Sequence, residues 1–552
     1  MYKLKNSKLL IFIIILLIGI FFRLWKLPQY PVHLSHDEVS QAYDAISIAQ
    51  TGRDIYGNFL PTIFPSVNDF KSPFYTYATS LVYFIIGNHE WMIRVVGVFF
   101  GICIIPAVFW FTLKLTKQVN IALFASLFTA ISPSEIFFSR KSFENGAGIF
   151  FLLVSLSCLL TYLEKQKQQR WLYSAVFLSA LGMYTYFSHA VIIPLMLAIF
   201  ILIFRKSFTQ GFKKYFPPFL LWILLLIPLI IIIMTNPGSR YRSQTVFIVQ
   251  DSTLERQLNY AESENSLISQ LLHFKTIGDF SFNRYLQQFD PVYLFGNGLD
   301  LTNQGPVNMG PLLLFQLPLL LIAAFYLIQR AGFTNFSKLL IFLVALGGLP
   351  SGLTFEPHSP HRIVIVFTLL NIITGIGAFS LWQKINNLKV IHKIILIFTL
   401  MVLLILNLVY FLHIYFVNYP YEKSQYIHYP FKQVARFAWS EYDNFEQIIF
   451  DPLFGELAPV IGTAAHYYLA YYGQYPSLKF QEKYHLGTKP REVIFDKFSI
   501  RQVYWPSDKN FKNTLIIVSP WSVPEADIED KSKIIKRFNF YDGKLAFYAI
   551  KL

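Results

Sequence analysis

The chain has 552 residues, of which 54% are hydrophobic and only 14% are charged, and its formal net charge is +15. A globular protein of this length usually carries about a quarter charged residues. Long apolar runs cause the deficit, so most of the chain is expected to lie in lipid. Lys and Arg gather in short clusters between these runs, a pattern typical of the positive-inside rule. The composition therefore argues against an ordinary soluble protein and against a nucleic-acid partner.

The first apolar run, at about residues 9–25, follows three lysines, Lys3, Lys5 and Lys8. No small-residue cleavage site follows its apolar stretch, which ends at Phe22 and is followed by Arg23 and Lys26. We therefore predict an uncleaved first span with its N-terminus in the cytoplasm. Both cysteines fall inside apolar runs and are interpreted as small core residues, not as a disulfide framework.

Eleven apolar runs are candidates for membrane spans, given a hydrocarbon core of about 30 Å. They lie at about 9–25, 91–113, 120–134, 146–163, 171–187, 190–204, 217–235, 309–328, 338–350, 363–383 and 394–416. Placing the basic clusters between them in the cytoplasm fixes the topology. The outer connections then include a first outer loop at 26–90 and a large outer loop at 236–308. The sequence predicts an all-α polytopic membrane domain over residues 1–416, with about eleven spans.

One further apolar segment, residues 73–86, is long enough for a helix. If it crossed, Lys114 and Lys117 would lie outside, against the positive-inside rule. We therefore predict a re-entrant or interfacial helix within the first outer loop.

Residues 417–552 have mixed charge and short strand-like runs that begin at Gln447, Thr514 and Leu545, with one helical stretch near 456–473. Such alternation indicates a small α/β domain. By the same topology, this domain is extracytoplasmic.

The first outer loop contains an acidic pair, Asp37 and Glu38, just before a predicted helix at 39–49. Adjacent carboxylates near a membrane surface suit proton acceptance from an incoming hydroxyl, or retention of a cation against a phosphate. A structural interpretation is also open, because carboxylates favour a helix N-terminus.

Several cations lie on the outer side, where the positive-inside rule does not favour them. An anionic group at headgroup depth, such as a lipid-linked phosphate, would give them a partner. Snorkelling of Lys71 and an ion pair of Arg140 with Glu144 are the plain alternatives. The candidate phosphate-binding residues are Lys71, Arg94, Arg140, His361 and Arg362.

Other outer residues are candidates for a substrate pocket. Tyr184, Tyr186 and His189 lie at an outer helix end, where aromatic belts are expected in any case. Asp290 lies in the large outer loop, and His358 precedes the His361–Arg362 pair. No P-loop, GxGxxG, HExxH or CxxC spacing appears, so nothing indicates nucleotide hydrolysis.

The order of these motifs resembles the superfamily of bacterial protein O-mannosyltransferases and aminoarabinose lipid A transferases, membrane glycosyltransferases of the GT-C fold. The motifs read Asp37-Glu38, Lys71-Ser72-Pro73, Gly87 to Glu90 and Arg94, and Ser139-Arg140 with Glu144. The likeness extends across most of residues 8–380. Lys-Ser-Pro stands where Lys-Pro-Pro is commoner, which leaves the lysine in place.

The resemblance implies an inverting hexosyl or pentosyl transferase in the cytoplasmic (inner) membrane. A polyprenyl-phosphate-linked sugar would be the donor, and a glycan, lipid or protein on the outer face the acceptor. By analogy Asp37 is the catalytic base or the acid that orients the acceptor, and Glu38 supports it. Lys71 with Arg94 or Arg362 holds the donor phosphate, and Glu144 and the other outer residues are candidates for the substrate pocket. The resemblance implies no cofactor with certainty, and participation of a divalent cation stays open.

A lipid or polysaccharide transporter or flippase of the cell envelope is the alternative. Transporters tend to carry internal repeats and helices broken at the midplane, and the sequence shows neither. The polar residues lie at the outer rim, which favours surface chemistry over transport.

Overall fold

The computed structural model describes residues 6–67, 69–165, 168–208, 211–235, 246–261, 267–300, 305–329, 334–356, 358–489 and 491–552. The chain divides into two compact units. The first, here called the helical unit, comprises Met1–Leu27 and Val96–Tyr415. The second, the mixed unit, comprises Pro28–Val95 and Phe416–Leu552, so the first outer loop clusters with the C-terminal residues. Parts of the expected large outer loop, at 236–245, 262–266 and 301–304, lie outside the described residues.

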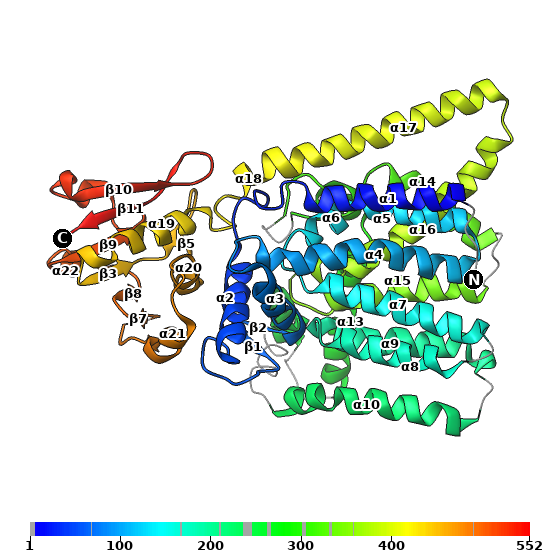
Figure 1. Ribbon diagram of the computed structural model, residues 1–552, viewed down its shortest axis with the longest axis horizontal. Helices are drawn as coiled ribbons and strands as arrows, with labels where there is room; N and C mark the ends of the chain where they lie inside the picture. Colours follow the sequence, from blue (N-terminus) through cyan, green and yellow to red (C-terminus); the bar gives the residue numbers. More distant parts are fainter. Residues whose placement is uncertain are drawn as a thin grey trace. The chain divides into compact units, whose positions relative to one another are not determined.

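A helix forms at each of the eleven apolar runs predicted from the sequence, which confirms the fold class (Figure 1). Their bounds are α1 Asn6–Leu24, α4 Met92–Thr116, α5 Val119–Ile131, α7 Asn145–Glu164, α8 Gln169–Met183, α9 Phe187–Ile203, α10 Phe212–Thr235, α14 Gln316–Gln329, α15 Asn335–Gly352, α16 Val364–Asn386 and α17 Val390–His413. A short helix, α6 (Pro133–Ser139), follows α5 after a bend of 55°.

Seven helices within the described ranges are long and apolar enough to cross a membrane unaided, or eight if α5 and α6 form one bent span. Two further apolar helices, α9 and α14, are shorter. A helix rises about 1.5 Å per residue, so a short helix covers only part of a core of about 30 Å. Helices thus form at all eleven predicted spans, while seven or eight in the described ranges have the length and composition of a full span.

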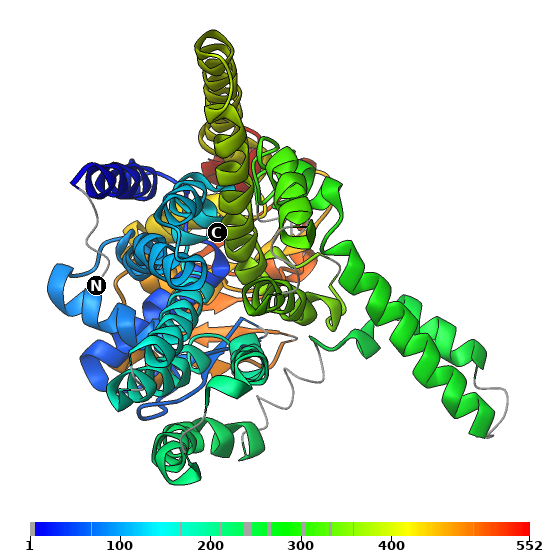
Figure 2. The ribbon, with the colours of Figure 1, turned by 90° about the vertical axis from the view of Figure 1, so that its right-hand side faces the viewer.

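The expected outer loop at 236–308 contains helices of its own. They are α12 (Ser252–Ala261) and α13 (Leu267–Gln287), and they project from the rest of the helical unit as the green pair in Figure 2. Helix α17 also stands apart, with only 6% of its apolar window buried.

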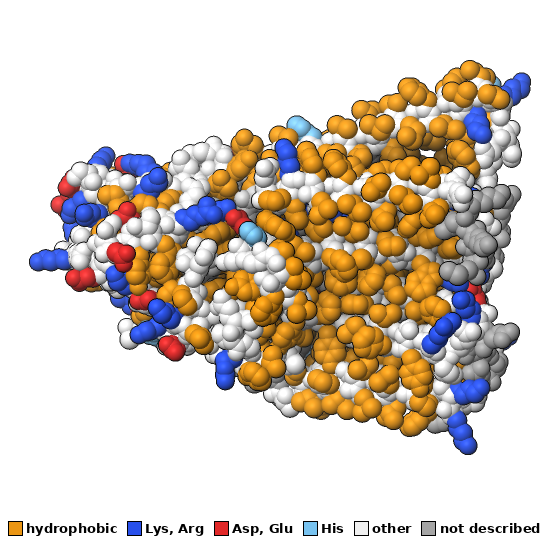
Figure 3. Space-filling model, viewed as in Figure 1, with side chains coloured by type: hydrophobic (Ala, Val, Ile, Leu, Met, Phe, Trp, Pro, Cys, Tyr) orange, Lys and Arg blue, Asp and Glu red, His pale blue; other side chains and the backbone are white. Residues whose placement is uncertain are grey.

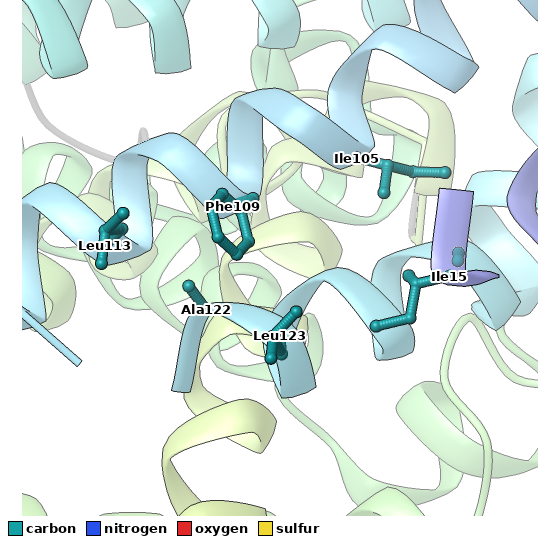
Figure 4. Packing of buried hydrophobic residues seen from close by; sticks show 7 residues of the cluster. Ile15, Ile105, Phe109, Leu113, Ala122 and Leu123 are labelled. Carbon is teal, nitrogen blue, oxygen red and sulfur yellow. The ribbon is translucent and has the colours of Figure 1, made fainter. Parts of the chain in front are cut away.

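The surface of the helical unit is apolar along the helices, and Lys and Arg side chains gather at the helix ends on the right of Figure 3. Inside, α1, α4 and α5 meet through a cluster that includes Ile15, Ile105 and Phe109 (Figure 4). Helices α5 and α16 approach closely, because a Cβ on Gly375 would lie 2.6 Å from the backbone nitrogen of Ala125. Small residues allow such close helix contacts in membranes.

The C-terminal residues form a seven-stranded mixed sheet in the order β10-β11-β9-β3-β8-β7-β6. The pairs β3–β8 and β3–β9 are parallel, and β10–β11, β11–β9, β7–β8 and β6–β7 are antiparallel. The bounds are β3 Gln447–Phe450, β6 His485–Leu486, β7 Val493–Phe495, β8 Phe498–Ile500, β9 Thr514–Val518, β10 Ile534–Asn539 and β11 Leu545–Lys551. The three strands predicted from the sequence correspond to β3, β9 and β11, so the predicted α/β domain is confirmed.

The predicted helix near 456–473 is partly wrong. Residues Leu453–Phe454 (β4) and Val460–Ile461 (β5) form a small antiparallel hairpin, and the helix α20 occupies only Ala465–Tyr472. Gly455 at φ +152° and Pro459 in this stretch are poor helix residues, which explains the late start. The other helices of this part are α18 Tyr419–Glu422, α19 Tyr429–Ser440, α21 Ser477–Lys483 and α22 Trp505–Asp508.

The first outer loop supplies two helices to the mixed unit, α2 (His36–Thr51) and α3 (Pro73–Ile86), and a hairpin of β1 (Phe64–Ser66) and β2 (Asp69–Lys71). Helix α3 has 14 residues, or about 21 Å, too short to cross a bilayer. Leu81, Phe84 and Ile85 on it are more than half exposed. These features agree with the predicted interfacial helix.

Candidate active site

Helix α2 begins with a capping box. The Glu38 backbone N–H donates to Ser35 Oγ at 3.4 Å, and the Ser35 N–H donates to a Glu38 carboxylate oxygen at 3.0 Å. This Ser-x-x-Glu pattern satisfies two backbone donors that a helix start leaves unpaired. Glu38 is thus a capping residue, as the structural interpretation of the acidic pair foresaw.

Glu38 also binds Arg94. The Arg94 Nε donates to Glu38 at 2.9 Å, and its Nη1 and Nη2 donate at 2.8 Å to the carbonyls of Pro31 and His33. Both charged side chains are 2% exposed. Such hydrogen bonds are charge-assisted and directional. Arg94 therefore ties the start of α4 to the loop before α2.

Asp37 has a different environment from its neighbour. Its side chain is 44% exposed, and it lies 3.3 Å from Lys71 Nζ and 3.4 Å from His36 Nε2. Lys71 also donates to the Asp37 carbonyl at 2.6 Å and to Ser40 Oγ at 2.9 Å. The Lys71 side chain is only 12% exposed. Lys71 thus holds the Asp37 backbone carbonyl and lies beside its carboxylate, while the Asp37 side chain stays partly exposed to solvent.

The β1–β2 hairpin places this lysine. Lys71 pairs with Phe64 in the antiparallel register, and Ser66 Oγ lies 3.0 Å from Ser40 Oγ on α2. The structure brings together four sequence-predicted residues, Asp37, Glu38, Lys71 and Arg94, all within the mixed unit.

C-terminal residues surround the same helix start. The His428 ring meets the His36 ring edge-on at 5.4 Å, and Tyr468 donates its hydroxyl to the Leu34 carbonyl at 2.7 Å. His33 stacks on Tyr468 with ring centroids 5.2 Å apart. No local pattern in the sequence links these residues to α2, because Tyr468 and Leu34 are 434 positions apart in the chain.

Glu90, which the sequence motif includes, is also held by the C-terminal part. It accepts hydrogen bonds from Lys432 Nζ at 2.5 Å and from the Tyr472 hydroxyl at 3.1 Å. The glutamate therefore connects the end of the first outer loop to α19 and α20.

Burial shifts the pKa values of the aromatic residues around the start of α2, namely His33, His428 and Tyr468. Desolvation lowers the pKa of His428 to about 3, with the nearby His36 adding to the effect and Asp37 opposing it. Burial, with Lys432 and His428 as the next causes, lowers the pKa of His33 well below 6.5. Burial raises the pKa of Tyr468 well above 10, and Glu38 and Asp37 add to that shift. Burial thus disfavours the charged forms of His33 and His428, while Lys71 Nζ lies 3.3 Å from Asp37.

Arg140 and Arg362 belong to the helical unit. Arg140 is fully buried, and its Nη1 donates at 3.0 Å to the carbonyls of Phe22 and Arg23, which end α1. Lysine and arginine side chains commonly satisfy such final carbonyls. Arg362 Nη2 donates to Glu356 at 2.9 Å, while its buried Nη1 has no hydrogen-bond partner among the described residues.

The remaining sequence-predicted residues are also in the helical unit, and each has a local structural contact. Glu144 is the N-cap residue of α7, and Asn145 donates to the His361 carbonyl. Tyr184 donates to the Leu225 carbonyl, Tyr186 is the N-cap of α9, and His189 Nδ1 lies 3.0 Å from Thr185 Oγ1. Asp290 accepts from the Val292 N–H, and His358 packs on Tyr293.

No group of three or more His, Cys, Asp and Glu side chains in the described ranges has the geometry to hold a metal ion. The described carboxylates and histidines around Asp37 therefore do not form a preformed metal-binding site.

The sequence and the fold were compared with known proteins. Residues 70–233 match the profile of the family described as dolichyl-phosphate-mannose-protein mannosyltransferase. ArnT from Cupriavidus metallidurans bound to undecaprenyl phosphate has a similar structure, with a TM-score of 0.54 and 12% identity, over 98% of this chain and 97% of that one. The chain has a GT-C-like fold. The resemblance expected from the motifs is confirmed, and the membrane-spanning nature of the chain with it.

A second similar structure is the archaeal oligosaccharyltransferase AglB from Archaeoglobus fulgidus in complex with an inhibitory peptide and a dolichol-phosphate. Its TM-score is 0.51 at 12% identity, and the match covers 86% of this chain. The chain spans 64% of the length of that longer protein. A search of curated proteins finds no match to this sequence.

Proposed function

We propose that this chain is a membrane glycosyltransferase that moves a sugar from a polyprenyl-phosphate carrier to an acceptor on the outer face of the cytoplasmic membrane. The observation that carries the proposal is the contrast between two adjacent carboxylates: Glu38 is 2% exposed and paired with Arg94, while Asp37 is 44% exposed beside Lys71. Glu38 stabilises the loop, while the Asp37 carboxylate is partly exposed to solvent, where a substrate could reach it.

The comparisons support the class of reaction. The family profile covers both Lys71 and Arg94, and its description names a mannosyltransferase that uses a dolichyl-phosphate sugar. Two proteins of similar fold have structures with undecaprenyl phosphate or dolichol-phosphate bound. A polyprenyl-phosphate donor is therefore the substrate class to test first.

In the proposed reaction, an acceptor hydroxyl gives its proton to the Asp37 carboxylate while its oxygen attacks the anomeric carbon of the sugar. The new C–O bond forms as the bond from the anomeric carbon to the phosphate oxygen breaks, and the phosphate leaves with the electron pair. Attack opposite the leaving group inverts the anomeric configuration. Orientation of the nucleophile and charge stabilisation of the departing phosphate supply the catalysis.

Arg362 is the phosphate-binding candidate that its contacts support best. Arg94 directs all three of its guanidinium nitrogens at protein acceptors, and Arg140 donates to the end of α1. Within the part of the chain that the structure describes, Arg362 keeps a buried Nη1 without a hydrogen-bond partner, although its side chain is 9% exposed. An unpaired buried donor is costly, and an anionic ligand would satisfy it.

The proposed orientation places the N-terminus in the cytoplasm and the C-terminal sheet outside. The gathering of Lys and Arg at one end of the helices supports it, because cytoplasmic loops carry the excess of cations. Because Asp37 comes after the first span, α1, this orientation puts Asp37 on the outer side of the membrane.

The test is release of undecaprenyl phosphate by the full-length protein in liposomes, from carriers that bear glucose, mannose or aminoarabinose. Release from at least one carrier, with the sugar appearing on an acceptor or on water, supports the proposal. Movement of an intact carrier across the bilayer without release would favour a transporter instead. Binding of undecaprenyl phosphate alone, followed by native mass spectrometry, should weaken in Arg362→Ala and not in Arg537→Ala, and equal binding in both would remove Arg362 from the site.

A further inference from the structure

We propose that His36 is a positioning residue, whose Nε2 holds one oxygen of the Asp37 carboxylate so that the carboxylate can meet an incoming acceptor hydroxyl. The inference rests on the proposed function, since His36 would act through the base of that reaction. His36, Asp37 and the residues that pack on them all belong to the mixed unit.

The Asp37 carboxylate is contacted on both of its oxygens. Lys71 Nζ lies 3.3 Å from Oδ1, and His36 Nε2 lies 3.4 Å from Oδ2. Each carboxylate oxygen has two lone pairs, so it can accept from its neighbour and still accept a second hydrogen bond. The Asp37 side chain is 44% exposed, so a hydroxyl can approach it from solvent. Two groups thus restrict the rotation of the carboxylate without covering it.

This contact between sequence neighbours does not follow from helix geometry. His36 and Asp37 are the first two residues of α2, and side chains one position apart in a helix do not face each other. The distance of 3.4 Å therefore requires the two side chains to turn toward each other. Hydrogen bonds of catalytic groups often shorten when substrate binds, so this distance suits a donor that tightens during the reaction.

Aromatic packing fixes the His36 ring. The ring is 23% exposed and meets the His428 ring edge-on, with centroids 5.4 Å apart. His428 packs in turn on Phe431 of α19 and Phe454 of β4, with centroids 5.0 and 5.4 Å away. Residues of the C-terminal part thus hold the imidazole in one orientation beside the carboxylate.

The other ring nitrogen of His36 does not compete for this role. Nδ1 is buried and has no hydrogen-bond partner in the part of the chain that the structure describes. A buried N–H without a partner is costly, whereas an Nε2–H can donate to Asp37, so the neutral ring carries its proton on Nε2. A phenylalanine would fill the same space without burying a polar atom. The contact with Asp37 is therefore what a histidine adds at this position.

The first measurement tests the contact without an assay of sugar transfer. Carboxylates of the full-length protein in detergent are labelled with a carbodiimide and glycine ethyl ester, and labelled peptides are quantified by mass spectrometry. Asp37 should label several-fold faster in His36→Ala than in the wild type. His36→Gln should restore the wild-type rate, because the glutamine amide can donate from the place of Nε2. Glu529, which is 89% exposed, is the internal control and should label equally in all three proteins.

The second measurement is kcat and KM for release of undecaprenyl phosphate in liposomes, from the carrier that the wild type uses. In His36→Ala, kcat should fall by up to about 10²-fold, the loss that a misplaced catalytic group produces, while KM stays the same. His36→Gln should recover most of the rate, and His36→Asn should not, since its shorter amide reaches only the place of Nδ1. His485→Ala, at an exposed histidine on β6, is the control and should keep the wild-type kcat.

A double-mutant cycle tests whether His36 acts through Asp37. In the Asp37→Asn background, His36→Ala should cause no further loss of rate, because the group that it positions is already gone. A full additional loss there, a wild-type kcat in His36→Ala, or equal labelling of Asp37 in all three proteins would overturn the inference and leave the transferase proposal intact. If the labelling responds as expected but the wild type releases no undecaprenyl phosphate from any carrier, the proposed function fails, and with it the role of His36 in that reaction, while the contact stands.

Discussion

The Glu38 carboxylate and the Arg94 guanidinium form a buried ion pair, with Nε donating to the carboxylate at 2.9 Å. Two backbone carbonyls and the capping box complete the polar contacts of this pair. An ion pair removed from water is retained only when its hydrogen bonds are satisfied. The pair therefore gives the loop before α2 a fixed geometry, from which Asp37 projects.

Breaking this pair should destabilise the protein. Glu38→Gln and Arg94→Ala each leave a buried charge without its partner, at an expected cost of about 3–5 kcal/mol. The measurement is thermal unfolding in detergent. Arg537→Ala is the matched control, because the Arg537–Glu525 pair is exposed and solvent screens such pairs. Equal losses for Arg94→Ala and Arg537→Ala would contradict the account.

Replacing Lys71 should affect catalysis more than folding. Lys71→Met removes the cation beside Asp37, so the carboxylate should become harder to ionise. We expect a lower kcat and an acid limb of the pH–rate profile that moves to higher pH. Lys71→Arg should recover part of the rate, since the charge returns. A variant with lower kcat but an unmoved acid limb would reduce Lys71 to a structural role.

The sequence predicted Asp37, Glu38, Lys71 and Arg94 because each lies in a short motif near a predictable helix start. The sequence did not predict that Glu38 would be buried with Arg94 while Asp37 stays exposed, although it contains the Ser35-x-x-Glu38 pattern of a capping box. The contacts of His428, Lys432 and the tyrosines of α20 could not be predicted from the sequence, because only tertiary packing brings these residues to the first outer loop. The predicted helix near 456–473 overlaps the second half of the β4–β5 hairpin, because periodicity alone cannot distinguish a short strand from a helix.

Stability should fall in mild acid. The pKa of His428 is lowered to about 3 and that of His466 to about 4, and the pKa of His33 lies well below 6.5. Below pH 6.5 the unfolded chain binds protons at these histidines and the folded chain does not, so stability is lost as the pH falls from about 6.5 toward 4. Each buried histidine whose pKa is lowered in this way adds to the slope of stability against pH in that window.

The check is Tm between pH 7.5 and pH 5. His428→Asn should flatten the slope, because asparagine does not titrate and tolerates the φ of +55° at this position. His485→Asn, at an exposed histidine on β6, is the control and should leave the slope unchanged. A wild-type Tm that is flat over this range would contradict the burial of neutral histidines.

The close contact of α5 and α16 gives a prediction for the helical unit. Gly375→Leu should separate these helices, because even a Cβ there would meet the Ala125 backbone at 2.6 Å. Overpacking of this kind costs about 1–3 kcal/mol. Gly278→Ala on α13 is the control, since no atom lies within 4 Å of its added Cβ. The measurement is the detergent melting temperature, which should fall only for Gly375→Leu.

The most direct test of the proposed reaction is the rate of sugar transfer by Asp37→Asn, measured as undecaprenyl phosphate released in liposomes from the carrier that the wild type uses. Because Asp37 is exposed and Glu38 keeps the helix cap, this variant should fold, with an unchanged Tm. General-base catalysis typically contributes 10²–10⁴-fold. The account predicts that the rate falls by about 10²-fold or more. A folded Asp37→Asn protein that transfers sugar at the wild-type rate would contradict the assignment of Asp37 as the base.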